Sequence, residues 1–500
     1  MIPINFPPGV TSLASKNAKI SNWREAHLVR WDNGITMRPV MGWEKLSLTP
    51  FASKLRKMHR WQLNSGITYF AYLCERHCYV EIDGALVDIT PVGGITPPPM
   101  GGGGYGDYLY GQELYGTPRP GESRMSLYTP IYSLDNWGEE LRAMSSNDGR
   151  YLGWKPSDPA GTKLTAVTNA PTGNRSFVIT PERHAMLFAM NAQYKFGWSD
   201  EEDDTNWLFG DLLSRARFYD IYPQSPIVTH QIADYGIIMF TTTMTYVIEW
   251  AGLPYVYIYR PVGKISIPIS PSSICNTPDG TVWPAVDGWW IYDGTVERTI
   301  PCPVWDFIQE HMNVVRARYS ATCVNVVNKG EVWWFYPDND APQGSNNRYV
   351  VWDYRSQIWT MGKLNRICGY TYANDVYPIM SDGVSVFRHE TGLTYEGAEM
   401  PWIESQNLAP DGGEHMLTLK KILPDVSGDA DALRWRMVKS NTRNGYTAET
   451  MSPQRKKNGN GFVDIRETAQ NMRLRIDMVK ATNWGTVGPI LFDSSMRGKK

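Results

Sequence analysis

The segment Trp289-Trp290-Ile291-Tyr292-Asp293-Gly294 carries the pattern that decides the fold of this chain. A short run of aromatic and β-branched residues, which favour strands, leads into an Asp-Gly turn. Related strand-and-turn units recur at residues 78–84, 151–154, 194–200, 246–250, 349–354 and 384–388. After the first gap, most spacings are about 35 to 60 residues, close to the ~40–50 residues of a four-stranded propeller blade. The sequence therefore predicts an all-β protein with a β-propeller of six or seven blades between about residues 60 and 395.

The alternative to a propeller is a set of unrelated β-hairpins packed as sandwiches, because aromatic strands with tight turns occur in any all-β protein. The three Trp-Asp dipeptides begin at Trp31, Trp305 and Trp352, which are irregularly spaced, and they lack an accompanying Gly-His. The repeats therefore differ from the WD40 class.

The pattern of residue types changes along the sequence and divides the chain into three parts. Residues 1–58 read as short strands and hairpins that pack on the propeller, residues 59–395 as the propeller, and residues 396–500 as a separate β-sandwich-like domain with period-2 alternation. Residues 93–122, rich in Gly, Pro and Tyr, read as a long loop inserted between the first two blades. One short helix is expected at residues 303–312, where apolar residues recur near helical spacing.

Composition excludes several classes of protein. The net charge is −2, from 49 Lys and Arg against 51 Asp and Glu. This balance argues against strong electrostatic binding of nucleic acid by the molecule as a whole. The N-terminus has no secretory signal pattern and no apolar run approaches the length of a membrane span, so membrane insertion is not expected. Six thinly spread cysteines predict synthesis in a reducing cytoplasm rather than a disulfide scaffold. The 20 tryptophans are expected mostly in blade cores.

No catalytic, cofactor or metal constellation stands out, and the chain is interpreted as a non-enzyme. Gly101, Gly103 and Gly106 satisfy G-x-G-x-x-G but lack the flanking strand and helix of a nucleotide site. The group Cys74, His77 and Cys78 reads as core thiols rather than a zinc site, and the run 200–204 as a solvated acidic loop rather than a calcium site. The turn at 277–283 only faintly resembles the Asp-box of sialidases.

Several segments together resemble one family, the tail nozzle of short-tailed bacteriophages, also called the packaged-DNA stabilisation protein or tail tubular protein B. They lie at residues 29–34, 38–43, 133–141, 198–203 with 206–207, 254–256, 292–294 and 332–337, so the resemblance runs from about residue 9 to 370 and weakens in the last ~100 residues. The residues that carry it are Arg30, Trp31, Gly34, Arg38, Pro39, Gly42, Trp43, Asp135, Asn136, Trp137, Gly138, Trp198, Ser199, Asp200, Trp333 and Trp334.

The resemblance implies a structural virion protein in a homohexameric ring below the portal and adaptor proteins, assembled in the host bacterial cytoplasm. It implies a channel that retains packaged double-stranded DNA and conducts it during ejection without sequence-specific binding, a propeller in each subunit, and distal partners of the needle, spike or fibre type. No cofactor is implied. The alternatives are a tail-associated propeller that binds a host surface glycan and one that cleaves it.

Charge is divided unevenly along the chain. Residues 411–500 contain sixteen basic and ten acidic residues, a net of +6, so the remainder carries −8 of the whole-chain −2. We expect the acidic part to line more of the channel and the basic part to face a partner protein or the outside. The basic residues in question are Arg455, Lys456, Lys457, Arg473 and Arg475.

Overall fold

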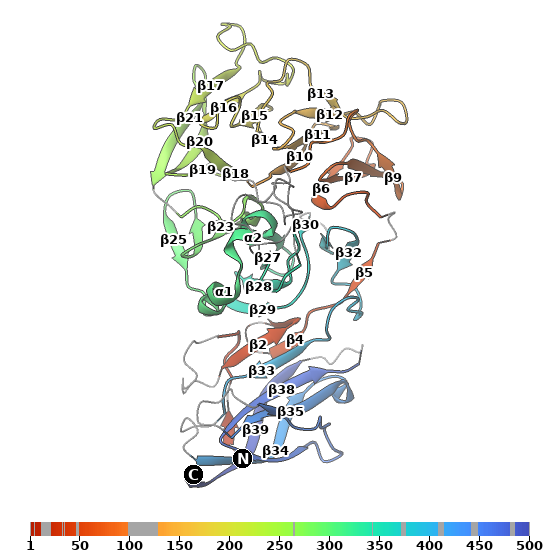
Figure 1. Cartoon of the computed structure of the whole chain (residues 1–500), viewed down its shortest axis with the longest axis vertical. Coiled ribbons are helices and arrows are strands. Elements are labelled where there is room, and N and C mark those ends of the chain that lie inside the picture. The colour runs from red at the N-terminus through yellow and green to blue at the C-terminus, as the bar shows by residue number, and fades with distance from the viewer. Residues whose placement is uncertain are drawn as a thin grey trace, which may run out of the picture.

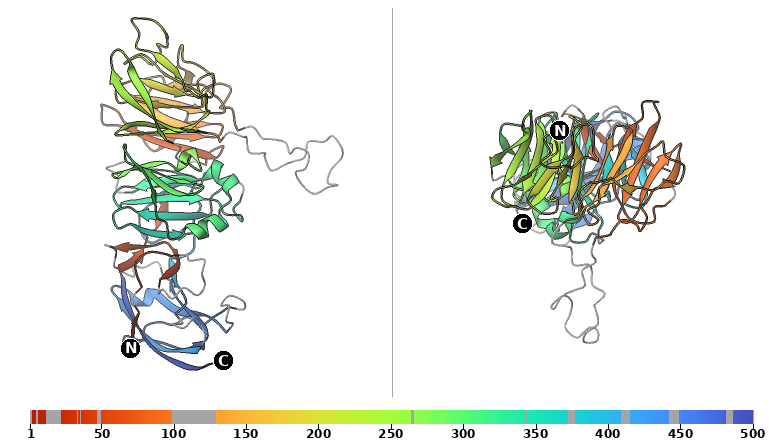
Figure 2. Two further views of the ribbon diagram at one scale, coloured as in Figure 1. Left: turned by 90° about the vertical axis from the view of Figure 1, so that its left-hand side faces the viewer. Right: turned by 90° about the horizontal axis from the view of Figure 1, so that it is seen from above.

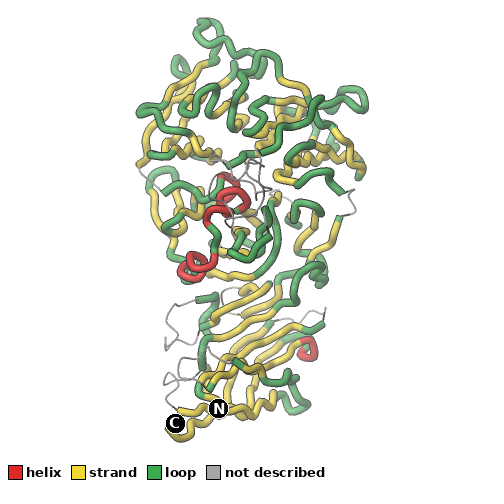
Figure 3. The backbone as a smooth tube through the Cα atoms, viewed as in Figure 1, coloured by secondary structure: helices red, strands yellow, loops and turns green. Residues whose placement is uncertain are grey.

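A computed structural model describes residues 2–4, 6–11, 22–32, 34, 36–46, 50–98, 129–263, 266–342, 344–371, 377–408, 415–441, 449–480 and 486–499. Strands dominate this part of the chain, and they form nine antiparallel sheets (Figure 3). Seven of the sheets have four strands each and surround a common centre, which confirms the predicted all-β propeller and sets the number of blades at seven (Figure 1).

Each blade is a meander in which consecutive strands run from the centre to the rim. Blade 1 is β6 (Leu55–Gln62), β7 (Thr68–Cys74), β8 (Cys78–Ile82) and β9 (Ala85–Asp88), and blade 2 is β10 (Tyr132–Trp137), β11 (Glu140–Ser145), β12 (Leu152–Trp154) and β13 (Thr165–Ala166). Blade 3 is β14 (Ser176–Ile179), β15 (Ala185–Phe188), β16 (Lys195–Trp198) and β17 (Arg217–Asp220), and blade 4 is β18 (Ile227–Ala233), β19 (Gly236–Thr241), β20 (Thr245–Gly252) and β21 (Val256–Gly263). Blade 5 is β22 (Cys275–Thr277), β23 (Gly280–Ala285), β24 (Gly288–Tyr292) and β25 (Glu297–Ile300), and blade 6 is β26 (Thr322–Val326), β27 (Glu331–Tyr336), β28 (Arg348–Asp353) and β29 (Ile358–Gly362).

Blade 7 joins the two ends of the ring. Its first three strands are β30 (Cys368–Tyr370), β31 (Ile379–Ser381) and β32 (Val386–His389), and its outer strand is β5 (Trp43–Lys45) from the N-terminal segment. Because β5 pairs with β32, more than 340 residues later by numbering, the propeller closes only when the N-terminal segment is in place.

The second strands of the blades are mostly apolar because they are buried on both faces. All six residues of β27, Glu331–Tyr336, are buried, and so are all four of β15. A middle strand of a blade is covered on both faces by the neighbouring blades, so both of its sides must be apolar or paired. The rim strands β9, β13 and β25 are mostly exposed.

Side chains of the innermost strands link each blade to the next around the centre. Six of the seven junctions carry a hydrogen bond: His59–Asn136, Ile179–Asp135, Ser176–His230, Asn276–Ile232, Asn325–Asn276 and Tyr370–Arg60. At the seventh, between blades 6 and 7, a Cβ on Gly369 would lie 2.3 Å from a methyl of Val324, so the lack of a side chain permits the close approach.

The remaining two sheets form a sandwich built from both ends of the chain. One contains β3 (Val29–Asp32), β4 (Thr36–Pro39), β39 (Val487–Lys499), β34 (His415–Val426) and β37 (Val463–Ala469), with β1 (Ile2–Ile4) also on β39. The other contains β2 (Trp23–His27), β33 (Trp402–Ser405), β38 (Asn471–Met478), β35 (Leu433–Ser440) and β36 (Thr450–Met451). The sandwich lies beside the rim of the propeller, next to β29, and the molecule is elongated (Figures 1 and 2).

The expected domain boundaries differ from the observed ones at the N-terminus. The segment 1–58 was expected to pack on the propeller as a unit, but it supplies strands to the sandwich, the outer strand of blade 7, and the start of β6 at Leu55. The expected insertion at 93–122 lies outside the described residues from residue 99 onward.

Two helices and two 3₁₀ turns complete the described structure. The helix expected at 303–312 is confirmed as α1 (Trp305–His311), and it is followed by α2 (Val314–Ser320), which the apolar spacing did not predict. The 3₁₀ turns are Pro271–Ser273 and Ala430–Ala432. No helix in the described part of the chain is both long and apolar enough to cross a membrane.

Candidate functional site

Residues of the N-terminal motif form the joint between the sandwich and the propeller. Arg30, on β3, donates two hydrogen bonds to Glu390 at 2.7 and 2.9 Å and one to Glu331 at 2.9 Å. Glu331 begins β27 and Glu390 follows β32, so one guanidinium holds blades 6 and 7 against the sandwich. All three side chains are buried, and burial raises the pKa of Glu331. The joint is therefore an internal ion cluster.

The rest of the 29–39 hairpin supports this joint. Trp31 is buried in the core, Pro39 is buried at the end of β4, and Gly34 adopts φ +67° in the connecting turn. Arg38 pairs with Asp32 at 2.9 Å, but both side chains are about a third exposed.

Gly42 and Trp43 fix the strand that closes blade 7. A Cβ on Gly42 would lie 2.3 Å from the carbonyl oxygen of Thr394, so no side chain fits there. The Trp43 ring lies 5.0 Å from the Arg366 guanidinium carbon, and its Nε1 donates to the carbonyl oxygen of Glu396 at 3.0 Å. This arrangement anchors β5 and buries a guanidinium against aromatic rings.

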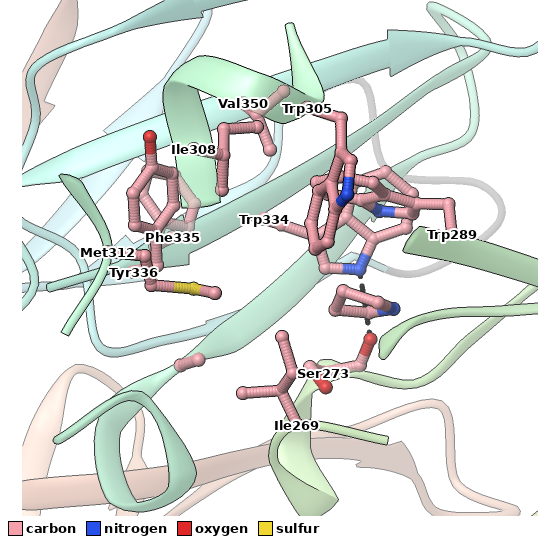
Figure 4. A pocket seen from close by; sticks show the side chains of 12 residues that line it. Ile269, Ser273, Trp289, Trp305, Ile308, Met312, Trp334, Phe335, Tyr336 and Val350 are labelled. Atoms are coloured by element: carbon pink, nitrogen blue, oxygen red, sulfur yellow. Dashed lines mark hydrogen bonds between the residues drawn. The ribbon is translucent and has the colours of Figure 1, made fainter. Parts of the chain in front are cut away.

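The side chains of Trp333 and Trp334 lie on opposite faces of β27. The Trp333 Nε1 donates to Glu331 at 2.9 Å and thus extends the Arg30 cluster, while the Trp334 Nε1 donates to the carbonyl oxygen of Ser273 at 2.9 Å. Figure 4 shows Trp334 beside Trp289 and Trp305 at an apolar cavity of about 20 Å³. A cavity of this size has room for little more than one water molecule and has an apolar lining, so it is a gap in the core rather than a ligand site.

The motif at 135–138 joins blade 2 to both of its neighbours. Asp135 accepts a hydrogen bond from the backbone N–H of Ile179 in blade 3, and Asn136 accepts one from His59 in blade 1. Trp137 lies under the guanidinium of Arg183, at 4.4 Å, and Gly138 turns the chain at φ +60°. Burial raises the pKa of Asp135 and lowers that of His59.

The motif at 198–200 shapes blade 3. Trp198 is fully buried, and its Nε1 donates to the carbonyl oxygen of Arg215 at 2.9 Å. Ser199 accepts from the backbone N–H of Ala185 at 3.0 Å, and Asp200 accepts from the backbone N–H of Arg215 at 2.8 Å. These side chains hold the long β16–β17 loop against the blade.

Two pockets flank blade 3. The first, of about 310 Å³, lies between blades 2 and 3 and is lined by Trp137, Glu140, Arg142, Lys155, Asp158, residues 165–168 and residues 202–205. Its charges are largely paired within its own wall, because Arg142 bonds Asp204 at 2.6 Å and Glu140 at 2.8 Å while Lys155 bonds Glu140 at 2.7 Å.

The second pocket, of about 270 Å³, lies between blades 3 and 4. It is lined by Thr180, Pro181, Glu182, residues 232–237, Ile248, Glu249, Trp250 and Tyr257. It combines aromatic rings with carboxylates and has no basic side chain among the described residues of its lining. Sequence reasoning missed this site because its walls come from turns of two different blades; the signal present was the Trp250 to Tyr255 hairpin tip, where a large aromatic residue precedes a Gly-Leu-Pro turn.

The acidic run at 200–204 was expected to be a solvated loop, but part of it is buried and paired. Asp204 is buried at 3% exposure and ion-paired with Arg142, and Asp200 is tied to backbone and Asn206. In the described part of the chain no group of three or more His, Cys, Asp or Glu is placed to hold a metal ion.

The cysteine group is divided between two strands. Cys74 ends β7 and Cys78 begins β8, with His77 in the turn between them. Both thiols are fully buried, and burial raises their pKa values, as expected of core thiols. The sialidase-like turn at Asp279 is an exposed part of the β22–β23 hairpin.

Basic residues of the sandwich fall into two groups. Arg455 and Lys456 are exposed and Lys457 half-buried, whereas the charged face of β38 is buried rather than half-exposed as the alternation predicted. Arg473 pairs with Glu404 at 2.7 Å and Arg475 with Asp477 at 2.8 Å. Of these five residues, Arg455, Lys456 and Lys457 are therefore the ones that present charge to a partner.

Acid is expected to loosen the centre and the joint through two buried histidines. Burial lowers the pKa values of His27 and His230 to about 4, and the Nδ1 atom of His27 accepts from the backbone N–H of Lys363. Since the folded pKa values lie below the unfolded value of ~6.5, stability is intact above that pH and falls as pH drops toward 4. Each histidine should cost about 2 kcal/mol between pH 6.5 and 5. Urea unfolding at both pH values should show a shallower pH dependence in His27→Gln than in the parent; equal slopes would contradict the assignment.

No protein-family model and no curated protein sequence matches the chain. Among solved structures, a streptogramin B lyase is similar over 70% of this chain and 97% of its own, with 8% sequence identity and a TM-score of 0.40. A putative exported protein from Bacteroides fragilis is similar over 53% of this chain and 90% of its own, with 8% identity and a TM-score of 0.30. At such values neither similarity bears on activity.

The sixteen motif residues thus gather in two places. Those of the N-terminal hairpins, with Trp333, lie at the joint and at blade 7, and those of blades 2 and 3 lie on the first to third strands of those blades and the turns that follow them, while Trp334 packs at the small cavity in blade 6. The first group makes ion-pair and packing contacts, and the second makes packing, turn and hydrogen-bond contacts.

Proposed function

We propose that this protein is a structural subunit of a homo-oligomeric ring, the tail nozzle of a short-tailed bacteriophage. The observation that carries the proposal is a set of exposed apolar side chains on the third-to-fourth strand connections of blades 3 and 4, named here the hairpin patch: Leu208, Leu212, Leu213, Leu253 and Tyr255. Leu212 and Leu213 are 95% and 92% exposed, whereas most described tryptophans are buried. Grouped apolar side chains on a soluble surface favour a protein contact.

The two loops of the patch lie on the same side of the propeller. Leu208 to Leu213 belong to the β16–β17 loop and Leu253 and Tyr255 to the β20–β21 turn, and within a meander both are third-to-fourth strand connections. The rings of Trp250 and His184, 5.8 Å apart, bring the β20–β21 turn against blade 3. A second copy of the chain is the occupant that a ring requires.

The motif contacts and the charge support the same proposal. A conduit subunit needs a rigid body, and the resembling residues make the joint and blade contacts that supply one. The near-zero net charge suits a channel that passes DNA, because each neutralised phosphate would add affinity and friction. The acidic lining of the channel and an outward basic loop at residues 455–457 are part of the proposal.

The decisive experiment measures the mass of the protein in solution by light scattering, alone and with candidate portal–adaptor complexes. We expect a six-fold ring, free or formed only on the adaptor. The double variant Leu212→Asp with Leu213→Asp should block the ring without altering thermal unfolding, because both side chains are exposed. Val384→Asp, at a 59% exposed position on the β31–β32 turn, is the matched control and should assemble normally. A strict monomer that ignores the adaptor would contradict the proposal and lead to a glycan screen.

A further inference from the structure

The pocket between blades 3 and 4 has features that the ring does not require. Its floor and walls come from the β14–β15 turn, the β18–β19 turn and the end of β20, and its volume is about 270 Å³. This is near the lower end of the ~300–1,000 Å³ typical of small-molecule sites.

Three aromatic residues line the pocket. Trp250 and Tyr257 meet edge to face with ring centroids 5.3 Å apart, and Tyr235 lines the opposite turn. Trp250 is 42% exposed and is the one exposed tryptophan among the described residues. An aromatic face left open to solvent at a pocket is available to a ligand.

Three carboxylates accompany these rings: Glu182, Asp234 and Glu249. Glu249 is paired with Arg260 at 2.8 Å, and Glu182 accepts from the Tyr257 hydroxyl at 2.9 Å. Neither Glu182 nor Asp234 forms an ion pair within the described part of the chain. The first pocket differs because it contains basic side chains, and two of its carboxylates, Glu140 and Asp204, already have Arg142 or Lys155 as partners.

A buried acceptor lies against the same aromatic wall. His184 has no exposed surface; its ring lies 5.6 Å from that of Tyr257 and 5.8 Å from that of Trp250. Its Nδ1 bonds the carbonyl oxygen of Ser199 at 2.8 Å and therefore carries the proton, while Nε2 has no hydrogen-bond partner in the described structure. Burial lowers the pKa of His184, so this ring behind the aromatic wall is neutral and adds no positive charge beside the pocket.

We propose that this pocket binds an organic cation, an ammonium or guanidinium group, which is either a free small molecule or the Lys or Arg side chain of a protein. Aromatic faces attract cations through the ring quadrupole, and the carboxylates supply the opposite charge. An anion is repelled by the three carboxylates, and a neutral sugar leaves their charge unmatched. The site shares the β20–β21 hairpin with the hairpin patch, but its test measures cation binding and not ring assembly, so failure of one proposal is distinguishable from failure of the other.

The test is calorimetric titration of the full chain with butylammonium and methylguanidinium chloride, with methyl glucoside and propionate as neutral and anionic probes. We expect millimolar binding of both cations, weakening with added salt, and none of the other two probes. Blocked tripeptides Gly-Lys-Gly and Gly-Arg-Gly identify the source: equal affinity indicates a protein side chain, and exclusion of the peptides with retained binding of the small cations indicates a free molecule.

Variants locate the site. Trp250→Ala should weaken cation binding about tenfold and Asp234→Asn about fivefold, in line with the ~0.5–2 kcal/mol of a cation–π contact and ~1 kcal/mol of a solvated charge pair. Asp158→Asn in the first pocket is the matched control and should leave the affinity unchanged. Absence of cation binding, equal binding of the glucoside, or unchanged affinity in Trp250→Ala would overturn the proposal.

Discussion

Replacing Arg30 with methionine is expected to lower the free energy of unfolding at pH 7 by about 3–5 kcal/mol, the usual cost of removing one partner from a buried ion pair. The substitution leaves Glu331 and Glu390 buried with no cation between them, at the point where blades 6 and 7 meet the sandwich. The change should appear as a lower urea midpoint and a lower melting temperature.

The pH dependence of this variant provides a second check. Without Arg30, the two carboxyls should bind protons in the folded state at higher pH than in the unfolded chain, so acid relieves the penalty. The difference in stability between parent and variant should therefore be smaller at pH 5 than at pH 7. The matched control is Arg38→Met, whose pair with Asp32 is about a third exposed and should contribute less than ~1 kcal/mol. Equal effects of the two substitutions would show that the cluster does not hold the joint.

Replacing Trp43 with alanine is expected to cost about 3–5 kcal/mol, because the change leaves a cavity in the core beside a buried guanidinium. Trp43 is 2% exposed, packs on Tyr395 with ring centroids 5.5 Å apart, and covers Arg366. Since it also begins the outer strand of blade 7, the loss should weaken closure of the ring.

Hydrogen exchange can locate the effect of Trp43→Ala. Amides of β5 and β32 should lose protection first, because their pairing depends on the anchored ring. Tyr222→Ala is the control that removes an aromatic ring at an 86% exposed position, and it should change stability by less than ~1 kcal/mol. Uniform loss of protection over all blades would contradict a local role in closure.

Local sequence patterns predict the strands of the blades, but they do not predict how the ring of blades closes. The aromatic run at 332–337 is followed by a hairpin partner at 349–354, and such pairs predict strands and their turns because the chemistry lies within a few dozen residues. The strand Trp43–Lys45 has only three residues and no periodicity to reveal it. Its partner β32 lies at the other end of the propeller sequence, so no local pattern indicates that the N-terminal segment completes blade 7.

The motif residues could be named from the sequence, but their contacts could not. Arg30 belongs to the resembling segments, whereas no sequence pattern singles out Glu331 and Glu390, because a carboxylate is buried only where the fold places a cation beside it. Likewise β38 alternates charged and apolar residues, yet its charged face is buried by Glu404 and neighbouring strands.

The sequence alone determined the all-β class, the strand-and-turn units, the first short helix and the predominance of buried tryptophan, because each depends on interactions between residues close in the chain. The tertiary structure decided the seventh blade, the shared construction of the sandwich from both termini, and the two pockets beside blade 3. Blade 7 and the sandwich join residues hundreds of positions apart, and the pockets join turns of neighbouring blades. A period-2 pattern states which side of a strand is buried without stating what covers it.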